Sequence, residues 1–220
     1  MIFVIFVMAM IEIKIDTRNF LLLSEKAIFW EDKKILIVSD LHLGKTSHFR
    51  KHGIAIPNRA AIKDLQKLNE LILKYNPESI IFLGDLFHSD YNNEWEIFIS
   101  FRKHYSAIHF ILIKGNHDII NPHLYSENYI SVHDSLYVDD ILFSHEKSKK
   151  KHFRFQFYGH THPGIKIKSK GKLAIKLPCF AQHKYTLLMP AFGELTGLYL
   201  IDKKDFDKIY AIAEGKIYTI

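Results

Sequence analysis

Five short polar clusters are spread along the chain, and their residue types are those that bind metal ions. They are Asp40-Leu41-His42, Gly84-Asp85, Gly115-Asn116-His117-Asp118, Ser144-His145 and Gly159-His160-Thr161-His162. Each cluster follows an apolar, strand-like stretch, and strands that end in Asp, Asn or His would deliver these groups to one edge of a sheet. Converging carboxylates, an amide and imidazoles predict a metal site.

The chemistry that such a site performs best is phosphoryl transfer, in which two divalent ions roughly 3.5–4 Å apart clamp the attacking and leaving oxygens. A carboxylate must bridge both ions, and Asp85 is the candidate because an Asp that follows a glycine at a strand end can be approached from two sides. Asp40 and His42 are two residues apart, so in extended backbone they point the same way and can share one ion. His160 and His162 have the same spacing and can also lie side by side.

Two further groups complete the predicted donor set, because Asn116 offers a carbonyl oxygen and His145 an imidazole. This mixture of oxygen and nitrogen donors suits two ions of Mn²⁺, expected first, or of Fe²⁺ or Zn²⁺. His117 is better placed outside the metal shell, where, backed by Asp118, it would protonate the leaving oxygen. A water that bridges the two ions, with its pKa lowered by them, would be the nucleophile.

The elements that must position these clusters follow from the hydrophobic periodicity. Residues 35–38, 79–83 and 108–113 are short apolar runs typical of buried strands, whereas residues 58–75 and 94–105 carry the apolar stripe of amphipathic helices. This alternation predicts a parallel sheet with crossover helices, and ligands bind at the carboxyl edge of such sheets.

The second half of the chain is predicted to be mainly antiparallel sheet packed on the first half, because the helical signal fades after about residue 130. The strand candidates are residues 141–143, 155–158, 165–167, 173–177, 187–189 and 198–201. No repeat, low-complexity tract or linker divides the sequence, so we expect one domain over residues 1–220.

The N-terminus is continuously apolar over residues 1–11. This is shorter than the roughly 20 residues of a membrane-spanning helix, and it lacks the basic start and cleavage site of a signal peptide. We expect a buried first strand, or an extension over residues 1–10 with the natural start nearer Met8 or Met10. A short membrane or partner contact is the alternative.

The composition is that of an ordinary soluble protein, with 48% hydrophobic and 25% charged residues among 220. The single cysteine, Cys179, excludes an intramolecular disulfide and favours a reducing, cytoplasmic compartment. The net charge of +6 is compatible with a phosphate-bearing partner.

The order of the five clusters resembles the calcineurin-like metallophosphoesterase superfamily, and the chain is similar to its ligase-associated branch. The segments that carry the branch resemblance are Ser39 to Lys45, Phe49-Arg50 with Gly53-Ile54 and Pro57, Gly84 to His88, Ser144 to Glu146, Leu177 to Phe180 and Leu188 to Gly197. The resemblance implies a four-layer α-β-β-α sandwich with mixed sheets.

The resemblance also implies a role for each polar residue. It places one ion among Asp40, His42, Asp85 and His162, and the other among Asp85, Asn116, His145 and His160. It gives His117 the leaving-group role, with Asp118 orienting it. Many members have glycine where this chain has Glu146, so His133 and His152 remain rivals of His145.

Several basic residues near the clusters are candidates for binding the substrate. They are Lys45, Arg50, His88, Lys149, Lys150 and Lys151, the last three within the basic run from Lys147 to Arg154. The alternative for each is a solvated loop residue without a ligand.

The leading hypothesis is therefore a cytoplasmic, two-metal phosphodiesterase or nuclease. The branch implies nucleic-acid ends in DNA repair, together with a ligase and a helicase, and no membrane. The alternative is a phosphodiesterase or phosphatase that acts on a small nucleotide-like phosphoester. A wide basic groove would favour nucleic acid, whereas a closed pocket would favour the small substrate. A non-catalytic scaffold of the same fold is a remote third hypothesis.

Overall fold

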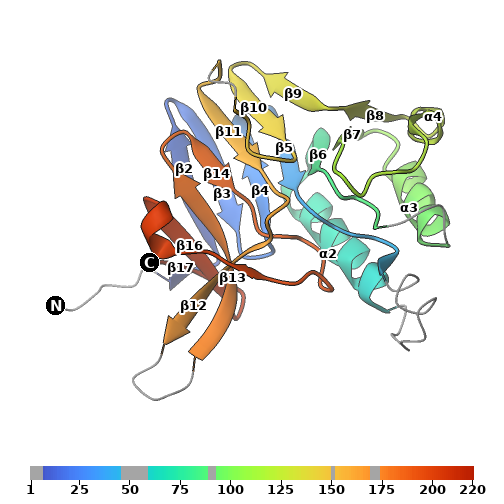
Figure 1. Cartoon of the computed structure of the whole chain (residues 1–220). Helices are drawn as coiled ribbons and strands as arrows, with labels where there is room; N and C mark the ends of the chain where they lie inside the picture. The colour runs from blue at the N-terminus through green and yellow to red at the C-terminus, as the bar shows by residue number, and fades with distance from the viewer. Residues whose placement is uncertain (1–6, 46–58, 89–92, 150–151, 169–173) are drawn as a thin grey trace.

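The computed structural model describes residues 7–45, 59–88, 93–149, 152–168 and 174–220. Two mixed β-sheets face each other, and the three α-helices of the described residues lie against the outer side of one of them (Figure 1). This arrangement confirms the expected mixed α/β class.

The first sheet has seven strands in the order β2-β3-β4-β5-β6-β7-β8. Their bounds are β2 (Met10–Ile15), β3 (Arg18–Leu23), β4 (Ala27–Trp30), β5 (Ile35–Val38), β6 (Ser79–Leu83), β7 (His109–Ile113) and β8 (Ile130–His133). Strands β5 to β8 are parallel, as the strand–helix alternation predicts. Strands β2 to β5 pair antiparallel, and the hairpins that form β2 to β4 were not predicted.

The helices cover one face of this parallel half. They are α2 (Arg59–Tyr75), α3 (Asn93–His104) and α4 (Pro122–Glu127). Leu68 of α2 and Phe98 of α3 belong to the same core as Val38 and Phe82 of the sheet. The apolar stripe of α2 is therefore buried on the sheet, and the crossovers bring the strand ends to one edge.

The second sheet has the order β1-β17-β16-β13-β14-β11-β10-β9, with β12 joined to β13 and β15 joined to β12. Its strands are β1 (Val7–Met8), β9 (Ser135–Val138), β10 (Ile141–Ser144), β11 (Phe155–Tyr158), β12 (Pro163–Lys168), β13 (Ala174–His183), β14 (Thr186–Leu188), β15 (Tyr199–Leu200), β16 (Lys208–Ala213) and β17 (Lys216–Thr219). Most pairs are antiparallel, but β10–β11, β11–β14 and β12–β15 are parallel. Aromatic side chains fill the space between the sheets, including Phe20, Trp30, Phe143 and Phe157.

In the described chain, the outer face of the second sheet is not covered by the helical layer that the four-layer sandwich implies. Cys179 and Ala211 point outward there, and the described residues that cover them lie on β12 and on the segment that contains the 3-10 turn η2 (Lys203–Asp205). Pro190, Gly193 and Gly197 interrupt the chain between β14 and β15. Such a segment lacks the uninterrupted apolar stripe that a helix would bury.

The described N-terminal strands lie at sheet edges, so the expected buried first strand is only half buried in this part of the chain. Met8 is 51% exposed and Met10 46% exposed. Residues 1–6 lie outside the described residues. Within the described chain, no helix is long and apolar enough to cross a membrane.

Candidate metal centre

The five polar clusters converge because the strands that precede them end at one edge of the two sheets. Backbone hydrogen bonds tie the loops together: Asp40 N–H donates to Gly84 O at 3.2 Å, and His42 N–H donates to Asp85 O at 2.9 Å. Across the second sheet, Gly159 N–H donates to His145 O at 3.0 Å. The side chains therefore come from loops that hold each other in place.

One group of donors consists of Asp40, His42 and His162, whose ligand atoms all lie within 4.8 Å of one another. The Nε2 atoms of His42 and His162 are 3.2 Å apart. Nε2 of His162 is also 3.3 Å from Oδ1 of Asp40. Three donor atoms thus surround a space that could hold one cation.

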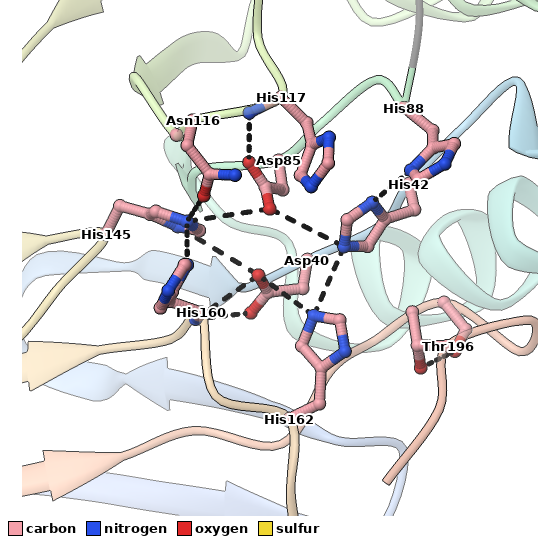
Figure 2. Close-up of polar contacts among 12 residues, drawn as sticks. Asp40, His42, Asp85, His88, Asn116, His117, His145, His160, His162 and Thr196 are labelled. Carbon is pink, nitrogen blue, oxygen red and sulfur yellow. Dashed lines mark hydrogen bonds and ion pairs between the residues drawn. The ribbon is translucent and has the colours of Figure 1, made fainter. Parts of the chain in front are cut away.

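A second group consists of Asp85, His145 and His160, again within 4.8 Å. Nε2 of His145 lies 3.0 Å from Nδ1 of His160 and 3.1 Å from Oδ1 of Asn116, so the amide oxygen joins this group. Figure 2 shows these side chains on one side of Asp85 and His42 on the other.

The Asp85 carboxylate lies between the two groups. Its Oδ2 is 3.6 Å from Nε2 of His42 and 3.5 Å from Nε2 of His145, as the dashed lines of Figure 2 mark. Its Oδ1 accepts the backbone N–H of His117 at 2.9 Å. Four imidazoles, two carboxylates and an amide oxygen make a donor set that fits two divalent ions of borderline softness.

Hydrogen bonds outside the two groups orient the donors. Nδ1 of His145 is 2.8 Å from Leu83 O. A proton on Nδ1 would be donated to this carbonyl, which leaves the lone pair of Nε2 facing the centre. Oδ2 of Asp40 accepts from the Ser39 hydroxyl, the His160 N–H is shared between Oδ2 and Oδ1, and Oδ1 also faces His162. The role of Ser39 was not predicted, although Ser39 lies next to Asp40 and within a segment that carries the family resemblance.

The protonation states of the first group suit metal ligation. Burial lowers the pKa of His42 to about 3, so its imidazole is neutral at neutral pH. Burial by itself would raise the pKa of Asp40, but the hydrogen bond and charge of His162, the charge of His145 and the Ser39 hydroxyl together lower it. A neutral imidazole and an ionised carboxylate are the forms that bind cations.

The backbone at the centre is left-handed rather than extended. The φ angles are 52° at Asp40, 49° at His42, 49° at Asp85, 69° at His160 and 51° at His162. Residues other than glycine adopt this region infrequently, and such strain clusters at functional sites. The extended-backbone reasoning for Asp40/His42 and for His160/His162 is therefore wrong. Asp40 and His42 nevertheless fall in one group, whereas His160 and His162 fall in different groups rather than side by side.

His117 lies beside the first group without belonging to either group. Its ring centroid is 5.5 Å from that of His42, and it stacks on His88 at 4.9 Å with an interplanar angle of 26°. His88 in turn places its Nδ1 3.2 Å from Nδ1 of His42. The three rings therefore form one contiguous cluster over the site.

Among the described residues, the hydrogen bonds of Asp118 do not involve the His117 imidazole, so Asp118 does not orient it. Its two oxygens accept backbone N–H groups, from Leu86 and Phe87 at 2.9 and 3.2 Å and from Gly115 at 2.9 Å. Successive residues of this turn point in different directions, with His117 toward the rings and Asp118 into the protein. Burial raises the pKa of Asp118 to about 6, and its carboxylate joins the loops after β6 and β7.

The proposed rivals of His145 are not part of the centre. Neither donor group in the described chain includes His133 or His152, and both side chains are exposed. Glu146 is exposed as well.

The candidate substrate residues have different positions. Lys45 is half-buried next to the first cluster, its N–H donating to His42 O at 3.3 Å, and Lys149 is exposed. Arg50, Lys150 and Lys151 lie outside the described residues. Arg154, at the end of the basic run, forms an ion pair with Asp16.

An open depression of about 430 Å³ adjoins the second donor group. Asn116 and His145 line it together with Lys114, Lys147 and Glu146. The centre is therefore approached through a surface of mixed charge, and no single described cation dominates its rim.

A loop behind the first cluster was missed as a structural support. Phe192 N–H donates to Ser39 O at 2.8 Å, and Gly193 N–H donates to Asp40 O at 3.2 Å. A Cβ at position 193 would come within 2.3 Å of Leu41 O, which leaves room only for glycine. The segment from Leu188 to Gly197, noted in the sequence for its resemblance, was the signal for this support.

Comparison with known proteins gives two kinds of match. Residues 33–161 match the family model of the calcineurin-like phosphoesterases. The crystal structure of the Pseudomonas putida nuclease MPE is similar with a TM-score of 0.81 and 26% identity, covering 96% of this chain and 100% of that one. The Escherichia coli phosphoesterase Yfce has a TM-score of 0.41 and 11% identity, covering 82% and 88%. No curated protein matches the chain.

Proposed function

Because the chain belongs to the calcineurin-like phosphoesterase family and is a metal-dependent hydrolase, we propose that it is a dinuclear phosphodiesterase that cleaves nucleic acid. The observation that carries the proposal is the Asp85 carboxylate, whose Oδ2 lies within 3.6 Å of imidazole nitrogens from both donor groups. A carboxylate in this position is the bridge that a two-metal centre needs.

Each ion would be held by four side chains, of which Asp85 is shared. Asp40, His42, Asp85 and His162 would hold one ion, and Asp85, Asn116, His145 and His160 the other. Two divalent ions bound there, Mn²⁺ in our proposal, would supply a nucleophile from water and neutralise charge on the phosphoryl group.

His117 is the residue of this chain that we assign to the leaving oxygen. Its backbone N–H is fixed on Asp85 at 2.9 Å, and its ring contacts those of His42 and His88 without entering either donor group. An imidazole held at the edge of the centre in this way can donate a proton to the departing alkoxide.

The assignment of nucleic acid as substrate rests on the similarity to a nuclease over the full length of both chains. The open form of the depression beside Asn116 and His145 supports it, because a polymer must pass across the centre. The ligase-associated branch extends the proposal to a cytoplasmic role in DNA repair, alongside a ligase and a helicase. Cells that lack this protein should then be more sensitive to DNA damage, and unaltered survival would argue against the repair role.

The activity is tested on a panel of substrates with and without Mn²⁺. The panel contains single- and double-stranded DNA, RNA, cyclic nucleotides and a generic aryl phosphodiester. We expect metal-dependent cleavage of a polynucleotide and of the aryl diester. Cleavage of small esters alone would instead assign the protein to small phosphoesters, and absence of all hydrolysis would overturn the proposal.

A further inference from the structure

The basic residues of the chain are concentrated in one segment that contains no acid. From Lys147 to Gly193 there are eleven Lys and Arg residues and no Asp or Glu. The whole chain has 30 basic and 24 acidic residues, so the remainder holds 19 basic and 24 acidic ones and is net negative by five. His160 and His162 lie inside this segment, so the positive charge and the metal centre belong to the same stretch of chain.

Within this segment, the β12–β13 hairpin carries two lysines that face each other. Lys166 pairs directly with Lys176 in the antiparallel register, and both side chains are exposed. Residues opposite each other share a face of the sheet, and like charges there are destabilising. No ion pair among the described residues neutralises either lysine. An anion that reaches both ammonium groups would relieve this repulsion.

The same face continues onto strand β15. Leu200 lies opposite Gly164 in the parallel register, so it shares the face of Lys166 and Lys176, and its side chain is 38% exposed. We call the surface formed by Lys166, Lys176 and Leu200 the lysine face. Figure 1 shows the β12–β13 hairpin extending beyond the neighbouring strands of the second sheet, and the exposed side chains of Lys166 and Lys176 leave this face accessible.

Strand β12 connects the lysine face to the metal centre. Strand β12 begins at Pro163, immediately after the donor His162, and Tyr199 N–H donates to His162 O at 2.9 Å. Lys166 is four residues from His162, about 13 Å along an extended strand. A phosphoester held at the centre would therefore be too short to reach the lysines unless it continued as a polymer.

We propose that the lysine face binds backbone phosphates of the nucleic-acid strand that extends from the metal centre, with Leu200 against its sugars or bases. This inference rests on the proposed nuclease function and deepens it. The successive phosphates of a strand can pair with both lysines, whereas a small phosphoester cannot. Contacts to phosphates position a strand without reading its sequence.

The test compares two double variants of the Mn²⁺-loaded protein. Lys166→Gln/Lys176→Gln removes the charge of the lysine face. Lys208→Gln/Lys216→Gln is the matched control, because both of these residues are exposed strand lysines near acidic residues. The kinetic constants for single-stranded DNA, duplex DNA, RNA and an aryl phosphodiester are measured over a range of salt concentrations.

For the lysine-face variant we expect a higher KM on a polynucleotide, an unchanged kcat and a weaker salt dependence of kcat/KM. The slope should fall by roughly 0.7–0.9 for each backbone phosphate that the variant no longer binds. Hydrolysis of the aryl diester should be unchanged in both variants, which also shows that each folds and holds its metals. The polynucleotide whose KM rises in the lysine-face variant identifies the type of strand that this face binds.

Three results would overturn the inference, and they are distinguishable. If the lysine-face variant cleaves a polynucleotide with the KM and salt slope of the wild type, the lysine face does not bind the strand. The proposed function would then be unaffected. If the wild-type protein hydrolyses the aryl diester but no polynucleotide, both the role of the lysine face and the proposed nuclease function are refuted. Equal effects in the control variant would show that net charge alone, and not this face, is responsible.

Discussion

Asp85 is the side chain on which both halves of the centre depend, since its Oδ2 lies between His42 and His145. Asp85→Asn replaces a bridging carboxylate with a neutral amide, which is a poor link between two cations. We expect hydrolysis to be nearly abolished while the fold survives, and elemental analysis to find fewer than two metals per chain. Two tightly held metals in the variant would refute the bridging role.

His117 should act on turnover without affecting metal content. His117→Gln should lower kcat by roughly 10²–10⁴-fold, the usual contribution of a general acid. The loss should shrink for an aryl diester with an acidic leaving group, because such a group needs little protonation. Equal losses for good and poor leaving groups would show that His117 does not supply the proton.

At the scale of elements, the centre depends on close approach of the loops that follow β5 and β11. Gly159 lies so near Ser39 that a Cβ at this position would overlap the Ser39 hydroxyl and the Asp40 carboxylate. Both groups are buried, so neither can move aside into solvent. The glycine is thus required for packing.

Gly159→Ala should therefore displace Asp40 and reduce both stability and activity. Overpacking of this kind costs on the order of 1–3 kcal/mol of unfolding free energy, measurable by denaturant titration. Gly197→Ala is the matched control, because a Cβ there meets nothing within 4 Å. Equal stability and metal content in the two variants would contradict the packing account.

Helix α2 supports the loop behind the first cluster through an ion pair between the half-buried Lys67 and the buried Asp64. Nζ of Lys67 lies 3.7 Å from Oδ1 of Asp64 and donates to Phe192 O at 2.7 Å, while Asp64 accepts the Glu194 N–H at 3.2 Å. Burial raises the pKa of Asp64 to about 6 and lowers that of Lys67 to about 8. Burial therefore outweighs the attraction between the two charges.

This pair predicts a pH-dependent stability. Because the folded-state pKa of Asp64 is above its unfolded value, its contribution is fully present below pH 4 and is lost as the pH rises through 6. Asp64→Asn lacks this titration, so the unfolding free energy of the wild type relative to the variant should fall by on the order of 2 kcal/mol between about pH 4 and pH 7. A difference that is constant with pH, by denaturant titration, would contradict the assigned pKa.

At the scale of the whole molecule, the predictable part of the fold was the part with strong periodicity. Strands β5, β6 and β7 and helices α2 and α3 appear within one or two residues of their predicted bounds, because the continuous apolar runs of the strands and the single apolar stripe of each helix fix their patterns. The hairpins of β2 to β4 and of β16–β17 were not predicted. Their pairing depends on the partner strand, which the local sequence does not show.

The candidate site, like the fold, could be predicted only in part. The polar clusters were visible because each comes directly after a buried strand. The contacts of Asp118 could not be predicted, because they depend on loops brought together from β6 and β7. The placement of His160 and His162 in different groups agrees with the family resemblance and not with their spacing, which favoured side-by-side positions.

The most direct test of the two-metal account is a titration of the chelator-stripped protein with Mn²⁺, following hydrolysis of an aryl phosphodiester. We predict no hydrolysis without metal and a plateau at two ions per chain, because the donors form two groups that share Asp85. Hydrolysis that needs no metal, or that is complete with one ion per chain, would contradict the account.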